Sequence, residues 1–435
     1  MNNIGENMKL NIINKKLYVF LFVFLLVFIA LSISNRTYSN SENITIDSNS
    51  AILIDTKTQK VLYEKNSNEK MYPASTTKIL TAIITLENSN LSDIATVSSY
   101  AVSALGPEYS SANLKYGEQL TVEQLLQLLL IHSANDAAIV LAEHVAGSVN
   151  SFISIMNTRT YELGLKNTNF TNVYGGHDEN HYTTASDLSK IMKYCMSNDN
   201  FRQISGSASC SIPATNMSDI RQYESTNELI VPTNSSYYPY ITAGKTGFTT
   251  PAGECLVSSA FHNNIELICI TLGGYTPLSR FTDTRHLFEY GYSNYSIQTI
   301  VESNSLIDTI EVPTSPISSI PLDLYSTDTI ATLLPNNTSI DSLAYKIDIR
   351  NNLLAPIKSG EVIGNITYTI DNIPYTTNLI SATEIQESMD FYYLLISLVI
   401  LFIILTSLIL IILIKRFLRK TNNISNEFKE FKSED

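Results

Sequence analysis

The chain has 435 residues, of which 44% are hydrophobic and 16% charged, and its formal net charge is −13. This length predicts two or more folded units, and the composition excludes a disordered, collagen-like or coiled-coil protein. The segment 37–390 holds 18 basic and 36 acidic side chains, a net charge of −18. Because phosphate backbones need neutralising cations, a body this acidic argues against nucleic acid as the partner.

Two apolar runs near the chain ends predict attachment to a membrane. The run 17–33 follows two lysines, so residues 1–39 are predicted to be a signal peptide or an uncleaved signal anchor. The run 392–414 carries no charge and is long enough for a transmembrane helix. The basic cluster that opens the tail, 415–435, predicts that this tail stays cytoplasmic. We therefore expect a cell-membrane protein with a single C-terminal span and an extracytoplasmic body.

The first part of the body alternates strand and helix patterns. A β-hairpin is predicted over 51–55 and 60–64 and a helix starting near Ala74, followed by helices over 125–131, 137–145 and 188–196. Their end signals are the capping box Thr121–Gln124, the stop at Gly147 and the polar start Thr184–Asp187. Strands over 241–250, 254–261 and 265–272 and a helix over 279–290 complete this part. The order predicts a sheet packed between helix layers.

Beyond about residue 298 the helix patterns stop. Short alternating runs at 306–312, 343–349, 361–370 and 375–380 predict a small all-β sandwich that serves as a spacer or docking module. The expected domains are thus 40–298 and 299–388, ahead of the transmembrane helix.

The cysteines and histidines do not predict a metal site. The four cysteines are scattered and form no CxxC pair, so we interpret them as buried free thiols. A disulfide between Cys195 and Cys210 is the alternative. His177 and His181 have the spacing of helical metal ligands but lie among Gly, Asn and Asp, which favours loop or helix-cap histidines. His132 is interpreted as structural.

Three short motifs could carry chemistry. Ser75-Thr-Thr-Lys78 places a hydroxyl and an ammonium on one helix face, where a lysine of lowered pKa could activate the serine. Ser133-Ala-Asn135 lies in the polar break between two apolar helices and could relay a proton and hold a carbonyl. Lys245-Thr246-Gly247 lies on a predicted strand, where Lys and Thr could bind a carboxylate and Gly permits close approach. Each motif alone is also common as a cap, turn or surface strand, but all three in this order point to one site.

Together the motifs resemble a known family. With Pro73–Lys78, Ser133–Ala138, His181–Ala185 and Lys245–Thr249, the chain is similar to the low-molecular-mass penicillin-binding proteins, serine D-alanyl-D-alanine carboxypeptidases of Gram-positive bacteria. The segment 355–360 resembles the family's C-terminal sandwich. The resemblance implies an α/β (α+β) transpeptidase fold shared with β-lactamases, in which an antiparallel sheet lies between helices beside an all-helical subdomain.

The resemblance also implies a role for each motif residue. Ser75 would attack the bond between two D-alanines of the peptidoglycan stem peptide, with Lys78 as base and Ser133 passing a proton to the leaving amine. Asn135 would hold the substrate amide, and Lys245 and Thr246 its carboxylate. The backbone N–H groups of Ser75 and Phe248 would form the oxyanion hole. β-Lactams would be trapped on the same serine, and no cofactor or metal is implied.

Other functions stay open at this point. The middle motif is Ser-Ala-Asn and no Glu-x-x-Leu-Asn segment follows, which disfavours a β-lactamase. A Ser-His-Asp hydrolase is disfavoured because no G-x-S-x-G elbow occurs. The three motifs do not separate a carboxypeptidase from an endopeptidase or transpeptidase. A catalytically degenerate, membrane-tethered wall-binding protein is the non-enzymatic alternative.

Overall fold

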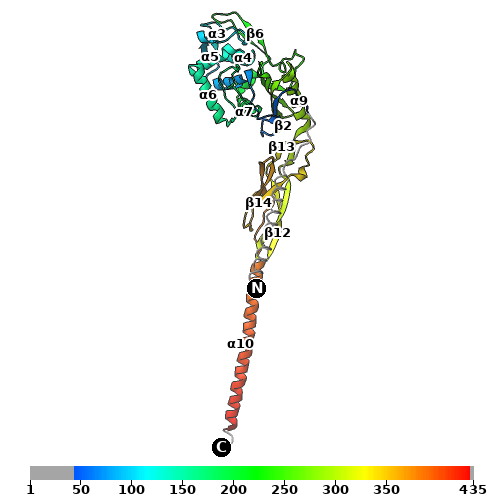
Figure 1. Ribbon diagram of the computed structural model, residues 1–435. Coiled ribbons are helices and arrows are strands. Elements are labelled where there is room, and N and C mark those ends of the chain that lie inside the picture. The colour runs from blue at the N-terminus through cyan, green and yellow to red at the C-terminus, as the bar shows by residue number, and fades with distance from the viewer. Residues whose placement is uncertain (1–43, 432–435) are drawn as a thin grey trace, which may run out of the picture.

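The protein is described here by a computed structural model that covers residues 44–431. The predicted signal segment 1–39 and residues 432–435 lie outside the described residues. Figure 1 shows three parts in line: an N-terminal α/β domain, a β-strand module and one long helix.

A five-stranded antiparallel sheet forms the centre of the N-terminal domain. Its spatial order is β2-β1-β9-β8-β7. The strands are β1 (Ser50–Asp55), β2 (Val61–Lys65), β7 (Ile241–Thr249), β8 (Gly253–His262) and β9 (Ile265–Gly274). The predicted hairpins and the predicted antiparallel sheet are confirmed. Since β7 is an edge strand, its outer side is free to meet other parts of the chain.

Helices cover both faces of this sheet. They are α2 (Lys78–Asn88), α3 (Ser99–Ser103), α4 (Val122–Leu130), α5 (Asn135–Ala146), α6 (Val149–Glu162), α7 (Ala185–Cys195), α8 (Asp199–Ser205) and α9 (Ser279–Asn294). Two small two-stranded antiparallel sheets lie among them: β3 (Ile94–Thr96) with β4 (Gln119–Thr121), and β5 (Ser209–Ile212) with β6 (Arg221–Glu224). Every residue of β1 is buried, because Leu53 faces the core that includes α9 while Ile52 and Ile54 face the core built around α2.

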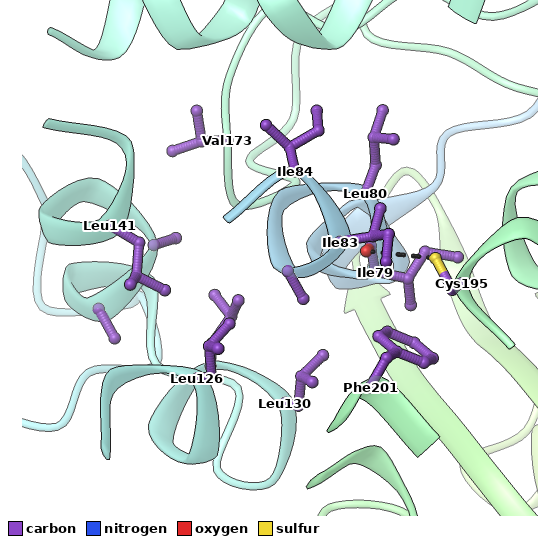
Figure 2. Close-up of a cluster of buried hydrophobic side chains, with 14 of the residues drawn as sticks. Ile79, Leu80, Ile83, Ile84, Leu126, Leu130, Leu141, Val173, Cys195 and Phe201 are labelled. Atoms are coloured by element: carbon purple, nitrogen blue, oxygen red, sulfur yellow. Dashed lines mark hydrogen bonds between the residues drawn. The ribbon is translucent and has the colours of Figure 1, made fainter. Parts of the chain in front are cut away.

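Helix α2 lies at the centre of the larger core. Figure 2 shows its apolar side chains surrounded by residues of four other helices, namely Leu126, Leu130, Leu141, Cys195 and Phe201. Ile79, Leu80, Ile83 and Ile84 are at most 2% exposed. Burying each such side chain contributes about 1.5–3 kcal/mol, so the position of α2 is strongly fixed. The residue that opens α2, Lys78, is therefore held deep in the domain.

The local signals at the helix ends act as predicted. Thr121 and Gln124 form the capping box of α4, Gly147 ends α5 in the left-handed conformation, and the Thr184 hydroxyl accepts from the Asp187 N–H at the start of α7. One prediction needs refinement. The helix expected near Ala74 begins with a 3₁₀ turn, Ala74–Thr77, and becomes α-helical only at Lys78.

The β-strand module contains two sheets. One pairs β10 (Tyr295–Val301) with β13 (Ile330–Pro335), and the other has the order β11-β12-β16-β15-β14. Its strands are β11 (Leu306–Ser315), β12 (Ser318–Ser326), β14 (Tyr345–Ile349), β15 (Val362–Ile370) and β16 (Ile373–Ser381). The predicted all-β module is confirmed, whereas the boundary at 298/299 falls within β10 and stays a prediction. Lys60 of the N-terminal domain pairs with Asp371 of the module at 2.8 Å.

The last element is α10 (Asp390–Phe431). Its part Asp390–Asn423 is long and apolar enough to cross a membrane, and its apolar window is not buried by the described residues. The four cysteines are buried and free, so Cys195 and Cys210 are not joined.

Candidate active site

Ser75 and Lys78 are in direct contact at the start of α2. Residues three apart nearly eclipse one another in a 3₁₀ turn, and the Lys78 Nζ lies 2.7 Å from the Ser75 Oγ. The same Nζ donates to the backbone carbonyl of Tyr174 at 2.8 Å. Ser75 is partly exposed, whereas Lys78 is fully buried. The serine can therefore meet a substrate while the amine stays shielded from water.

The surroundings of Lys78 favour its neutral form. Burial lowers the pKa of Lys78 well below that of an ordinary lysine, and the positive charge of Lys245 lowers it further. Asp136 opposes this shift with a smaller effect. A neutral amine can use one N–H for the Tyr174 carbonyl and its lone pair for the Ser75 hydroxyl proton. The pair thus has the chemistry of a nucleophile and its general base.

Two glycines hold the backbone around Ser75. A Cβ on Gly247 would lie 2.9 Å from the Ser75 amide nitrogen, and one on Gly175 would lie 1.8 Å from the Ala74 carbonyl oxygen. Gly175 also has a φ of +88°, which L-residues rarely adopt. Ala74 itself has a φ of 47°. The loop at Gly175 and the edge strand β7 therefore clamp a strained turn, as is common next to a nucleophile.

The second motif forms the turn before α5. Ser133 is buried with a positive φ of 67°, and the Asn135 N–H donates to the Ser110 carbonyl at 2.9 Å. The Asn135 Oδ1 is buried and finds no hydrogen-bond partner among the described residues. A buried acceptor of this kind is costly unless something else satisfies it. It is suited to accept from the amide of a bound peptide.

Asp136, one residue further on, braces this turn. Its carboxylate accepts the backbone N–H groups of Ala112 and Leu114 at 3.1 Å each and the Ser111 hydroxyl at 2.6 Å. It also lies in the first turn of α5, where the helix dipole favours a negative charge. Asp136 therefore ties the loop around residue 112 to the second motif.

The third motif lies on β7. Lys245 is buried, and its Nζ donates to the Thr246 carbonyl at 2.8 Å. Burial, aided by the charge of Arg280, lowers the pKa of Lys245 to about 7. A carboxylate brought next to this amine would favour the charged form, which suits an anion-binding role. The Phe248 side chain is 57% exposed, so only its backbone is a candidate for chemistry.

Thr226 links the second and third motifs. Its hydroxyl lies 2.7 Å from the Thr246 hydroxyl, and its N–H donates to the carbonyl of Ile131 at 3.1 Å, two residues before Ser133. The structure thus brings Ser75 and Lys78 into contact. The charges of Lys245 and Asp136 are close enough to affect the pKa of Lys78, and Gly247 packs against the backbone of Ser75. The catalytic and binding roles of the motif residues stay predictions.

His181 is a supporting residue that the motif analysis did not assign to the site. It is 1% exposed; its Nδ1 accepts the Thr171 N–H at 3.0 Å, and its Nε2 lies 2.8 Å from the Thr77 Oγ1. Thr77 in turn donates to the Ala74 carbonyl at 2.8 Å. Burial lowers the pKa of His181 to about 4. The ring is a neutral brace beneath the Ser75 turn, and both its nitrogens are engaged.

The other histidines have separate contacts. The exposed His177 meets the Tyr72 ring edge-on at 4.7 Å, and His132 packs on the Tyr223 ring at 4.0 Å. Within residues 44–431, no three His, Cys, Asp or Glu side chains are grouped so as to hold a metal ion.

Comparison with known proteins identifies the family. Residues 36–276 match the family of D-alanyl-D-alanine carboxypeptidases, and residues 295–387 match the C-terminal domain of penicillin-binding protein 5. The chain belongs to the D-alanyl-D-alanine carboxypeptidases. It is 30% identical over 352 residues to the carboxypeptidase DacF of Bacillus subtilis, covering 79% of this chain and 87% of that protein. Over 335 residues it is 30% identical to DacC of Escherichia coli, covering 75% and 81%.

Solved structures of this carboxypeptidase family share the fold. Penicillin-binding protein 5 of Haemophilus influenzae superposes with a TM-score of 0.60 at 25% identity, covering 79% of this chain and 99% of that one. A mutant of the DD-transpeptidase of Streptomyces K15 superposes with a TM-score of 0.53 at 32% identity, covering 57% of this chain and 99% of that one. The predicted transpeptidase fold is confirmed.

Among relatives in sequence, a D-alanyl-D-alanine endopeptidase of Pseudomonas aeruginosa is 29% identical over 241 residues, covering 55% of this chain and 76% of that protein.

Proposed function

We propose that this protein is a serine D,D-carboxypeptidase that removes the terminal D-alanine from peptidoglycan stem pentapeptides. The observation that carries the proposal is the 2.7 Å contact between the Ser75 hydroxyl and a fully buried Lys78 of lowered pKa. A serine hydroxyl becomes a useful nucleophile only when a base takes its proton. Here the base is already in place, and burial, by lowering its pKa, favours the form that can accept a proton.

In this proposal the three motifs share the acylation step. Ser75 Oγ attacks the carbonyl carbon between the two D-alanines while its proton passes to the Lys78 Nζ. The oxyanion is stabilised by the backbone N–H groups of Ser75, in the 3₁₀ turn before α2, and of Phe248 on β7. As the C–N bond breaks, Ser133 passes a proton to the leaving amine and is reprotonated from Lys78. D-Alanine departs and the shortened peptide stays as an ester on Ser75.

Binding of the substrate relies on the remaining residues. The Asn135 Oδ1, buried and without a partner among residues 44–431, accepts a peptide N–H of the substrate. Lys245 and Thr246 bind the terminal carboxylate, and this charge holds Lys245 protonated. Water then attacks the ester, giving up a proton to Lys78 while the Ser75 oxygen leaves and regains one. A β-lactam acylates Ser75 in the same way, but the nitrogen of its broken C–N bond stays attached to the adduct through the opened ring.

The long apolar helix α10 anchors the enzyme in the cell membrane in this proposal. It follows the β-strand module directly, and basic residues follow its apolar part, which favours a cytoplasmic C-terminus. The β-strand module then stands between the membrane and the active site. Such a position fits an enzyme that acts on the cell wall outside the cytoplasm.

The test is release of D-alanine from a pentapeptide ending in D-Ala-D-Ala by the full chain in detergent. We expect release by the wild type and by a Ser211→Ala control on the β5–β6 hairpin, and none by Ser75→Ala. A crosslinked muropeptide dimer is offered in parallel, because a family relative is an endopeptidase. Cleavage of the dimer but not of the pentapeptide would show that the protein is an endopeptidase and not a carboxypeptidase. No turnover of either substrate by a folded wild type would favour a degenerate wall-binding protein.

A further inference from the structure

The hairpin between β11 and β12 ends beside the first turn of α10. Its tip is the turn Ser315–Ser318, and the Ser388 N–H donates to the Thr314 carbonyl at 2.8 Å, two residues before α10 begins. A hollow of about 370 Å³ is lined jointly by this hairpin, Leu354, Glu387 and Tyr392. Figure 1 shows the yellow hairpin reaching the top of the orange helix. The hairpin tip and the helix start therefore form one end of the module.

This end of the module exposes apolar side chains. Ile317 at the tip is 56% exposed, Leu354 is 58% exposed and Met389 is 52% exposed. They come from three separate segments, and a soluble domain usually hides such a group against a partner. The opposite end of the module faces the N-terminal domain, where Asp371 pairs with Lys60. The apolar end thus points away from the active site and along α10.

The start of α10 sets the depth of these side chains. Tyr392 and Tyr393 are 51% and 65% exposed, and aromatic residues at the end of an apolar span sit in the headgroup region of a bilayer. Tyr392 lines the same hollow as Leu354 and the hairpin. If α10 crosses the membrane, the hairpin tip is brought to the level of its tyrosines.

We infer that the tip formed by Ile317, Leu354 and Met389 inserts into the outer interface of the membrane that α10 crosses. This inference rests on the proposed anchor. The partner is the lipid interface, because the apolar tip is continuous with the span and lies at the depth where amphipathic side chains partition. Glu387 and Asp390 add negative charge here, so a zwitterionic phosphatidylcholine surface, which has no net charge, suits the tip. Helix and tip together would hold the module upright and fix the distance of Ser75 from the membrane.

The chain contains no tryptophan, so one introduced indole reports its own surroundings. The full chain is reconstituted into phosphatidylcholine vesicles, with and without lipids brominated near the headgroup end of the acyl chains. Ile317→Trp and, independently, Leu354→Trp report the tip. Phe402→Trp, at a 67% exposed position within α10, reports the anchor. Tyr345→Trp is the matched control in the same module: it lies on β14 at a 59% exposed position and pairs with Tyr368, toward the Asp371 end of the module.

We expect blue-shifted emission and bromine quenching for both tip variants, and water-like, unquenched emission for Tyr345→Trp. Water-like emission from both tip variants, with a blue-shifted indole in Phe402→Trp, would overturn the inference and leave the anchor intact. Water-like emission from Phe402→Trp as well would overturn the anchor and the inference together. The D-alanine assay is independent of all these outcomes, so failure here is separable from failure of the proposed catalysis.

Discussion

Gly247 lies so close to Ser75 that a Cβ on the glycine would come within 2.9 Å of the serine amide nitrogen. The edge strand β7 thus sets the position of Ser75, the proposed nucleophile, by direct backbone packing. Lys245 and Thr246, the proposed carboxylate-binding residues, precede Gly247 on the same strand, so β7 fixes their position relative to Ser75.

Gly247→Ala should impair acylation. The added methyl meets the Ser75 backbone, the Pro73 carbonyl and the Ala74 Cβ at 2.9–3.1 Å, and none of these can swing away. Overpacking costs about 1–3 kcal/mol, so we expect penicillin acylation to slow by at least about fivefold. Gly106→Ala is the control, because its nearest neighbours are the flexible carboxylate atoms of Glu108. Equal acylation rates in both variants would show that the contact does not position Ser75.

Catalysis of carboxylate substrates should decline as the pH rises above about 7. The pKa of Lys245 is lowered to about 7, so above that pH the free enzyme loses the charge that pairs with a carboxylate. We expect kcat/KM for a D-Ala-D-Ala peptide to fall above pH 7. The same peptide with its C-terminal carboxylate amidated should show no such fall. Lys245→Arg keeps its charge and should move the fall to higher pH. A decline that Lys245→Arg leaves unmoved would belong to another group.

Thr226→Val should weaken the binding of the substrate carboxylate. If the Thr226 hydroxyl donates to Thr246 across their 2.7 Å contact, the Thr246 proton is left for the carboxylate. Losing one such hydrogen bond costs about 1 kcal/mol, or about fivefold in kcat/KM, and we expect most of it in KM. Thr226→Ser should restore the value. A similar loss with the amidated peptide would indicate a general structural effect instead.

His181 should make the protein less stable in acid. Its pKa is lowered from 6.5 to about 4, so below pH 6.5 the unfolded chain takes up a proton that the folded protein does not. The contribution of neutral His181 to the free energy of unfolding is therefore fully present above pH 6.5. It is lost as the pH drops to about 4, by about 3 kcal/mol in all. His181→Gln should flatten this dependence, measured by thermal unfolding in detergent. The exposed His144→Gln should unfold like the wild type at every pH; the same slope in His181→Gln would contradict the assignment.

Much of the fold could be predicted from the sequence because its signals are local. The Thr121 capping box and the Gly147 stop each act within a few residues, and both lie where expected. Helix α6 was not predicted, because only Phe152, Met156 and Thr160 along its length are buried. The strands of the two-stranded sheets β3–β4 and β5–β6 are too short to show an alternating pattern.

The motifs indicated which side chains are candidates for the chemistry but not which other residues hold them in place. The Tyr174 carbonyl reaches Lys78 from 96 residues away, and His181 reaches Thr77 from 104 residues away. Contacts of this kind depend on tertiary packing, which no spacing in one sequence encodes. The left-handed conformation of Ser133 was equally hidden, because serine does not signal a positive φ as glycine does.

The most direct test is the intact mass of the full chain after benzylpenicillin treatment, with the modified residue located by peptide mapping. The central claim is that buried Lys78, whose pKa is lowered, makes Ser75 the nucleophile. We predict one adduct, on Ser75, in the wild type; none in Ser75→Ala; and strongly slowed formation in Lys78→Met, whose side chain fills similar space without a base. An adduct on another residue, or equal acylation of Lys78→Met, would contradict the account.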